Sequence, residues 1–165
     1  MSMQGLGAAL INALEEYNGF IDVEAARADD RLSEREALSF YRDCAVSGFQ
    51  FRLCLQFRDS GRLDKAAAVL RLSPGRYSTG KGSICSFMQS RFGQPKIIED
   101  QDLPENAPLP ELERRVWAGQ YGESYTLMIT FGASSERGDV RVGLVRKFPS
   151  EAYRSEAPSL EDLFY

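Results

Sequence analysis

The residues best suited to chemistry lie between positions 75 and 83, which spell Gly-Arg-Tyr-Ser-Thr-Gly-Lys-Gly-Ser. Glycines such as Gly75 and Gly80 allow backbone N–H groups to converge on a phosphate, and Lys81 would neutralise part of its charge. We expect Ser83 to begin a short helix that ends near residue 92, so the helix N-terminus would add positive potential. The pattern predicts a possible phosphate-binding site at Gly75, Gly80, Lys81 and Ser83.

With its Gly-Lys-Gly-Ser ending, this segment resembles the phosphate loop of adenylate-kinase-like nucleotide-binding enzymes. The resemblance covers nine residues and implies that Lys81 contacts the terminal phosphates and Ser83 a magnesium ion. Such a loop normally follows the first strand of a parallel sheet, whereas the later strands of this chain predict an antiparallel meander. We therefore favour a Gly/Ser turn with incidental positive charge and keep a nucleotide site as the alternative.

Other catalytic chemistry is limited because the 165 residues include no histidine. Ser-His-Asp or Cys-His catalysis and histidine-ligated zinc are thereby excluded. The three cysteines Cys44, Cys54 and Cys85 have no metal-binding spacing, and we interpret them as small buried residues of a reducing, cytoplasmic protein. We expect no catalytic residues, metal or cofactor, and a protein that is not an enzyme.

A strand with two different faces is predicted for residues 49–58. Its odd positions are large and apolar, whereas its even positions place Gln50, Arg52, Gln56 and Arg58 on the other side. This pattern is typical of a sheet with one buried face and one open face, and open faces often take part in recognition.

Two further sets of residues extend the predicted partner-binding face. Arg115, Trp117 and Tyr121 alternate in a later expected strand, and Arg141 and Lys147 alternate in the last one. Arginine and tryptophan are frequent interface anchors. The alternative is that Trp117 is buried and the arginines are simply solvated.

Charge is unevenly distributed along the chain, whose net charge is −4. Residues 1–48 carry −5, residues 49–100 carry +5 and residues 101–165 carry −4. The middle third therefore favours an anionic partner, and we expect another protein with an acidic surface. The alternative is that these cations pair with the acidic flanks. Nucleic acid is the less favoured partner because the pI is near 5.0 and no RNP pattern is present.

The predicted fold class is α+β, with two N-terminal helices packed on an antiparallel sheet of about five strands and a short inserted helix. Apolar spacing predicts a helix over 4–18, and the Ser33/Glu36 capping box predicts a second one through Ala45. The expected extended segments are 49–58, 63–72, 96–99, 114–121, 125–131 and 140–148. Residues 1–150 would form one domain, followed by an acidic, aromatic tail at 151–165 that either docks on the domain or binds another protein. No apolar run approaches the roughly 20 residues of a membrane helix.

These observations lead us to expect a non-enzymatic protein-binding module, such as an inhibitor, an immunity-type protein or an adaptor. Sixteen arginines against four lysines suggest a bacterial or phage origin. The alternatives are a nucleotide- or phosphate-binding enzyme that uses residues 75–83, and a single-stranded nucleic-acid binder.

Overall fold

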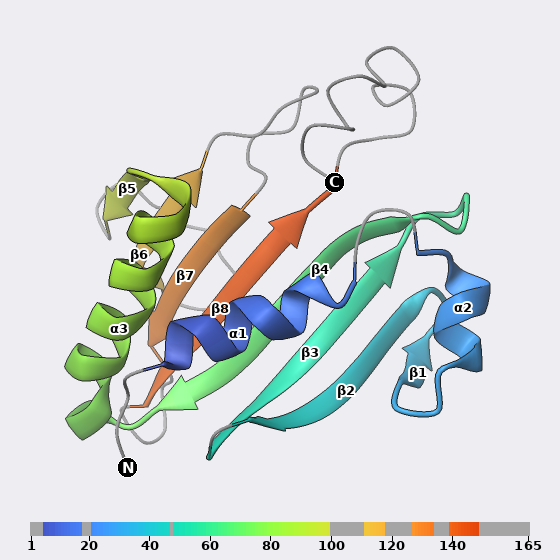
Figure 1. Cartoon of the computed structure of the whole chain (residues 1–165), viewed down its shortest axis with the longest axis horizontal. Coiled ribbons are helices and arrows are strands. Elements are labelled where there is room, and N and C mark those ends of the chain that lie inside the picture. The colour runs from blue at the N-terminus through green and yellow to red at the C-terminus, as the bar shows by residue number, and fades with distance from the viewer. Residues whose placement is uncertain are drawn as a thin grey trace.

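A computed structural model describes residues 5–17, 21–46, 48–99, 111–117, 127–133 and 139–148. These residues form one antiparallel sheet of eight strands with three helices (Figure 1). The helices are α1 (Leu6–Glu15), α2 (Val23–Ala28) and α3 (Pro74–Phe92). The strands are β1 (Ser33–Glu36), β2 (Ser39–Val46), β3 (Phe49–Phe57), β4 (Leu63–Leu72), β5 (Lys96–Glu99), β6 (Glu111–Trp117), β7 (Leu127–Ala133) and β8 (Val140–Lys147).

The sheet consists of two four-stranded meanders that meet at its centre. Its strand order is β1-β2-β3-β4-β8-β7-β6-β5, so the first meander ends at β4 and the second one ends at β8. Helix α3 follows β4 and leads to β5 at the far edge, from which the chain returns strand by strand. The β4·β8 pairing runs in unbroken register from Lys65↔Lys147 to Leu72↔Val140.

The core lies between the sheet and the two longer helices, which pack against each other on one face (Figure 1). Leu6, Leu10 and Leu14 of α1 are fully buried, because their spacing of four places them on one side of a helix. Gly7 allows the two helices to approach closely. A Cβ atom at this position would lie 2.8 Å from Cβ of Phe87 in α3.

The turn between β3 and β4 is also linked to the end of β8, in the other half of the sheet. Residues 58–62 connect β3 to β4, and Gly61 adopts a φ of 90°, which favours glycine. From this turn, Arg58 donates to the carbonyl oxygen of Phe148, just after β8, at 2.7 Å and forms an ion pair with Asp64 of β4 at 2.9 Å. Both charged side chains are about one-fifth exposed. The Arg58 guanidinium therefore holds the β3–β4 hairpin to the end of β8.

The structure confirms an α+β fold with an antiparallel sheet, but the sheet has eight strands instead of about five and the helices are placed differently. The helix expected from Ser33 to Ala45 is wrong. Ala37 and Leu38 form a two-residue turn between β1 and β2, with Leu38 at a φ of 69°. Within β2, Phe40 and Cys44 are buried while Asp43 and Ala45 are exposed, which is the period of a strand.

A short second helix occurs earlier instead, between the helix expected over 4–18 and the one expected from Ser33. Asp22 precedes α2, and its side chain accepts a hydrogen bond from the Ala25 N–H at 2.8 Å. An aspartate that caps the first turn in this way stabilises a helix start by about 1 kcal/mol.

Helix α3 begins nine residues earlier than expected, at Pro74 instead of Ser83. Proline is well suited to the first position of a helix because its missing N–H would be unpaired there in any case. Gly80, Ile84, Cys85 and Met88 are buried, and their spacing gives the helix one face toward the sheet. The expected turn at 75–83 is therefore helical.

The residue ranges of the remaining strands agree with the expected ones to within a few positions. The end of the expected strand 114–121, including Tyr121, lies outside the described residues. So does the predicted tail at 151–165. The extent of the domain over residues 1–150 stays a prediction.

Candidate functional site

The candidate site is the face of the sheet opposite α1 and α3, which we call the open face. Strand positions alternate between this face and the core, so Gln50, Arg52 and Gln56 of β3 are exposed between buried neighbours. The three residues share one face, as the sequence pattern predicts. Their role in partner binding stays a prediction.

Arg52 is already engaged on this face. Its guanidinium donates to both carboxylate oxygens of Asp43 in β2, at 2.8 and 3.2 Å, and lies 4.5 Å from the centre of the Tyr41 ring. The hydrogen bonds from Arg52 lower the pKa of Asp43. Arg52 therefore contributes little net charge to the open face.

Four other basic side chains supply that charge, and they stand in two like-charged pairs. Lys65 lies directly opposite Lys147, and Arg71 lies directly opposite Arg141, on the central strands β4 and β8. Within the described part of the chain, Lys65, Arg71 and Arg141 form no ion pair. Like charges directly opposite each other on neighbouring strands destabilise a sheet. Among the residues whose register places them on the open face, β2, β3, β4 and β8 thus contribute five cations and one carboxylate, Asp43. Asp64, next to Lys65 at the bulge of β4, is paired with Arg58.

Between the two basic pairs, β4 and β8 present only short apolar side chains on the open face. The neighbouring positions on β3 and β7 include Cys54 and Met128 as well as the polar Arg52 and Thr130. These positions follow from the register of adjacent strands, which places directly paired residues on the same face. The apolar ones are all half-buried. We call this apolar set the floor; its members are Cys54, Ala67, Val69, Gly143, Val145 and Met128.

A cavity of about 470 Å³ adjoins the Arg71 end of the open face. It lies where β4 passes into α3, beside the starts of β3 and β8. Its polar lining includes Gln50, Arg71, Arg76 and Asp139. Two arginines and one carboxylate therefore line the cavity, which continues the positive charge of the Arg71–Arg141 pair.

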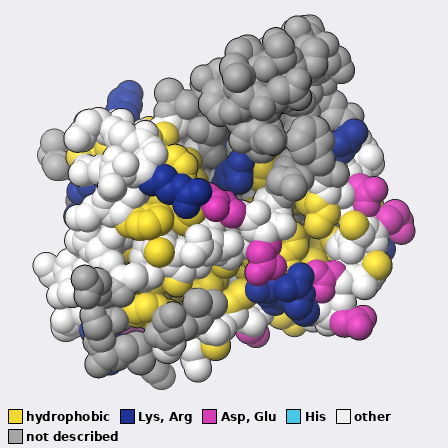
Figure 2. Space-filling view, viewed as in Figure 1, with side chains coloured by type: hydrophobic (Ala, Val, Ile, Leu, Met, Phe, Trp, Pro, Cys, Tyr) yellow, Lys and Arg dark blue, Asp and Glu magenta, His cyan; other side chains and the backbone are white. Residues whose placement is uncertain are grey.

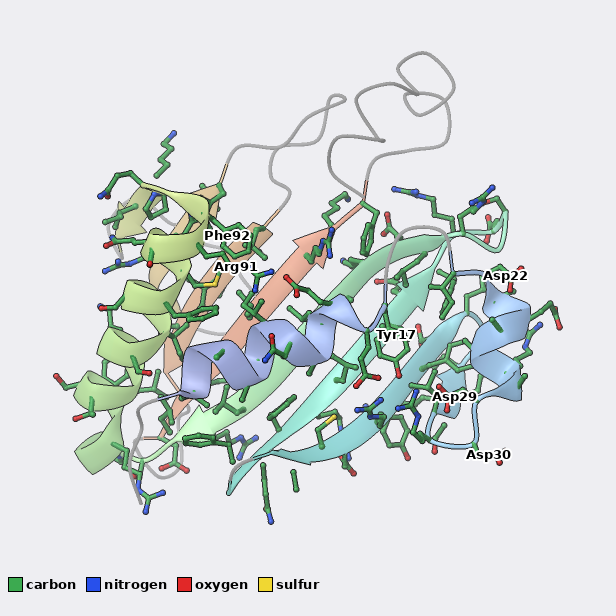
Figure 3. All side chains as sticks on the ribbon, in the orientation of Figure 1. Tyr17, Asp22, Asp29, Asp30, Arg91 and Phe92 are labelled. Carbon is green, nitrogen blue, oxygen red and sulfur yellow. The ribbon has the colours of Figure 1, made fainter. Side chains whose placement is uncertain are left out.

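The helix side of the molecule has a different charge arrangement, with basic and acidic side chains next to each other (Figure 2). Arg42 of β2 donates to Glu16 and to the Tyr17 hydroxyl, both at 3.0 Å, and Arg31 donates to Glu16 at 3.2 Å and to Asp29 at 3.0 Å. Tyr17 lies just past the end of α1, over the sheet (Figure 3). This cluster ties α1 to β2 and to the segment after α2, so we interpret it as structural.

Electrostatics within this cluster favour the ionised carboxylates. The hydrogen bond from Arg42 holds the pKa of Glu16 below its ordinary value, and hydrogen bonds from Arg31 do the same to the pKa of Asp29. Burial raises the pKa of Tyr17, so that side chain stays neutral and can accept the hydrogen bond from Arg42. These shifts arise from ion pairs within the fold.

Two residues that the sequence grouped with the open face, Arg115 and Trp117, lie on the other face of the sheet. Arg115 and Trp117 pair with Ile129 and Leu127, which are buried under the helices, so both point to the helix-covered face. Trp117 is only 7% exposed and donates from its indole N–H to the carbonyl oxygen of Gly93 at 3.0 Å. Arg58 serves as the structural link described above. Tyr121 lies outside the described residues.

Sequence reasoning missed Lys65 and Arg71, although Arg141 and Lys147 were singled out. The segment 63–72 is dominated by alanine and leucine, and its pairing with β8 cannot be read from local pattern. The signal that was present is the even spacing of Lys65 and Arg71, six residues apart, which places both on one face of a strand.

The predicted phosphate-binding residues lie within α3. A phosphate loop works because its backbone N–H groups point at the anion, but those of an α-helix interior are bonded along the helix axis. Gly80 is buried, and the Lys81 ammonium group lies 5.4 Å from the Phe131 ring and 5.7 Å from the Tyr77 ring, toward the sheet. The segment that contains Gly75 and Ser83 therefore lacks the loop conformation that the resemblance implies.

No cysteine in the structure forms a disulfide, and Cys44 and Cys85 are buried. Cys54 is half-buried in the floor, and burial raises the pKa of its thiol, which disfavours the reactive thiolate. Among the described residues, no group of three or more cysteine or acidic side chains is arranged to hold a metal ion. In the same part of the chain, no helix has the length and apolarity required to span a membrane.

Comparison of the chain with protein-family models, curated proteins and solved structures gave no match.

Proposed function

We propose that this protein is a non-enzymatic protein-binding module that binds an acidic surface of another protein through its open face. The observation that supports the proposal most strongly is that Lys65 lies opposite Lys147, and Arg71 opposite Arg141, on the central strands of an acidic chain. Because the directly opposed Arg71 and Arg141 repel each other in the free protein, an anionic partner that neutralises them would regain that energy on binding.

The apolar floor between these pairs supports a protein partner in particular. Half-buried alanine, valine and methionine side chains provide area for hydrophobic contact, while the surrounding cations favour the correct partner and speed its approach. A bacterial or phage inhibitor, immunity-type protein or adaptor fits these properties.

Single-stranded nucleic acid is the weaker candidate for the same surface. Proteins that bind it present several aromatic rings on which bases stack. Among the described aromatic residues, only Tyr41 lies on the open face, and its ring is occupied by Arg52. Phosphate contacts alone would also be expected to give a strong dependence of binding on salt concentration.

Affinity capture from the native host with charge-reversal variants would test the proposal. We expect proteins retained by the wild-type chain to be lost with Arg141→Glu or Lys65→Glu and kept with Arg76→Glu. Arg76 is exposed in the first turn of α3 and lines the cavity at the Arg71 end, so its reversal changes net charge equally and separates binding in that cavity from binding along the strands. Urea unfolding of each variant checks that it is folded.

A retained protein counts as a partner only if its acidic surface is confirmed by reconstitution of the complex from purified components. If Arg141→Glu, Lys65→Glu and Arg71→Glu all leave that complex as stable as the wild type, the open face is not the binding surface.

A further inference from the structure

The structure of the open face also indicates which structural element of an acidic partner it would bind. This inference rests on the proposed function. We propose that the element bound on the open face is an amphipathic α-helix of about 13 residues, with carboxylates near both ends and an apolar face between them. Three properties of the open face support this inference: its spacing, its floor and its backbone.

The spacing of the basic pairs sets the length of the bound element. Lys65 and Arg71 are six residues apart on β4, and their partners Lys147 and Arg141 are six apart on β8. At about 3.3 Å per residue, the two pairs stand about 20 Å apart along the strands. A helix rises about 1.5 Å per residue, so about 13 residues cover this distance.

The floor determines what lies between the two charged ends. Across the central strands, Ala67 pairs with Val145 and Val69 pairs with Gly143. Strands β4 and β8 therefore place no large side chain in the middle of the open face. Such a shallow, apolar strip leaves room for leucine- or valine-sized side chains of a partner. A partner that carried charge along its whole length would leave part of that charge desolvated against the floor.

The backbone of the open face favours a helix over an extended peptide. Strand β4 pairs with β3 on one side and with β8 on the other. Strand β8 likewise lies between β4 and β7. The N–H and C=O groups of β4 and β8 are therefore used within the sheet and cannot pair with an added strand. An extended peptide on this face would lose water from its own backbone groups without replacing those hydrogen bonds, whereas a helix satisfies its backbone internally.

The opposite face of this sheet shows that a helix packs on its strands, although α1 crosses them at an angle and the proposed helix runs along them (Figure 1). Helix α1 crosses β3 and β4 there and contacts them through its apolar side (Figure 1). A bound helix on the open face would complete a three-layer arrangement, with helices on both faces of the sheet.

The test uses the full chain and a synthetic helical probe of 14 residues. The probe carries glutamates in its first and last turns and leucines at i, i+4, i+7 and i+11, and it is labelled for fluorescence anisotropy. Two control peptides have the same length: one replaces glutamate by lysine, and the other keeps the composition but moves the glutamates to the middle. We expect saturable binding of the probe alone, weakened about tenfold by Arg141→Glu and by Lys65→Glu.

Val145→Lys separates the helix proposal from simple charge attraction. Val145 lies at the centre of the floor, and the substitution adds positive charge while it removes apolar contact. Under the proposal this variant binds the probe at least about fivefold more weakly, because a charge is buried against the leucines. An interaction driven by charge alone would instead become tighter.

Three results would overturn the inference. They are tighter binding to Val145→Lys, equal binding of the control with central glutamates, and the absence of saturable binding of the probe. An effect of Arg76→Glu as large as that of Arg141→Glu would also overturn it, because it would place the binding in the end cavity instead of along the face. If the probe fails while natural partners are still lost with Arg141→Glu, the proposed function stands and only the helical partner is rejected.

Discussion

At the scale of single residues, arginines on the two sides of the sheet serve different purposes. Arg31, Arg42 and Arg58 are paired with carboxylates and connect elements that are distant in sequence. Arg71 and Arg141 face each other on the open face. The same residue type therefore stabilises the fold at one place and opposes it at another, and the difference depends on whether a carboxylate or another cation lies opposite.

Arg58 provides the first prediction. Arg58→Ala removes a charged hydrogen bond to the Phe148 carbonyl oxygen and leaves the Asp64 carboxylate without that partner. We expect the free energy of unfolding to fall by about 2 kcal/mol, measured by urea denaturation. Arg76→Ala, on an exposed residue of α3, should change it by less than about 0.5 kcal/mol. Equal effects of the two variants would show that Arg58 does not link the turn to β8.

The second prediction concerns pH and Glu16. Because the pKa of Glu16 is lowered in the folded protein, its contribution to stability is present above the ordinary value of 4.5 and is lost as pH falls through the folded pKa. We therefore expect wild type to be more stable than Glu16→Gln at pH 7 and the two to converge below pH 4.5. Urea denaturation across this range measures the difference.

Glu24→Gln is the matched control for the pH experiment. Glu24 also pairs with an arginine, Arg27, but its side chain is 76% exposed, and exposed pairs contribute little to stability. Its substitution should leave the stability close to that of the wild type at every pH. A constant gap between wild type and Glu16→Gln down to pH 3 would contradict the assignment.

At the scale of elements, the contact between α1 and α3 depends on the absence of a side chain at Gly7. Gly7→Ala places a Cβ atom 2.8 Å from Cβ of Phe87 and 3.2 Å from Cα of Ile84, so one helix must move. We expect a loss of about 1–3 kcal/mol of unfolding free energy, since overpacking exceeds the gain from alanine's helix propensity.

Gly82 is the control for that substitution, because it is also helical but a Cβ atom there meets nothing within 4 Å. Gly82→Ala should therefore raise the unfolding free energy by up to about 1 kcal/mol. Opposite signs for the two Gly→Ala changes would confirm that α1 and α3 are in close contact at Gly7. A gain at both positions would mean that the helices are farther apart.

How much the sequence could predict differs from element to element. The period of two in β3 and the spacing of four in α1 are local and strong, and both elements were predicted correctly. Residues 33–45 were misassigned because Leu38, Tyr41 and Ala45 also fit a helical period, and a turn at Leu38 with positive φ has no sequence signal. Residues 75–83 were misassigned because three glycines suggest a loop, whereas packing of Ile84 and Met88 on the sheet keeps them helical.

The candidate site was only partly predictable for a related reason. Local alternation is sufficient to place Gln50, Arg52 and Gln56 on one face. It cannot show that β8 lies next to β4, about 75 residues away in the chain, and this pairing is what creates the Lys65–Lys147 and Arg71–Arg141 contacts. Register between distant strands depends on the whole sheet.

At the scale of the whole molecule, we expect the like-charged pairs on the open face to favour partner binding and to lower the stability of the free protein. Arg141→Gln removes one like-charged contact, so the unfolding free energy should rise by about 0.5 kcal/mol while affinity for an acidic partner falls. Salt screens the same repulsion, so the wild type should gain more stability than Arg141→Gln between low and high ionic strength.

Urea denaturation at two salt concentrations measures both effects, with Arg76→Gln as the reference. If Arg141→Gln is less stable than the wild type at low salt, then Arg141 is stabilised by its surroundings and the proposed electrostatic cost is absent. That result would also remove the main support for an anionic partner.

The central position of β8 has a consequence for how the protein is made. The ribosome completes β1 to β4 first, but the open edge of β4 stays without its partner until residues 140–147 have emerged. During that interval, the apolar segment 66–72 presents unpaired backbone groups to any other nascent chain. The last of the described strands to be synthesised, β8, is thus the one that joins the two halves of the sheet. The nascent chain therefore stays prone to aggregation until β8 has been synthesised and has paired with β4.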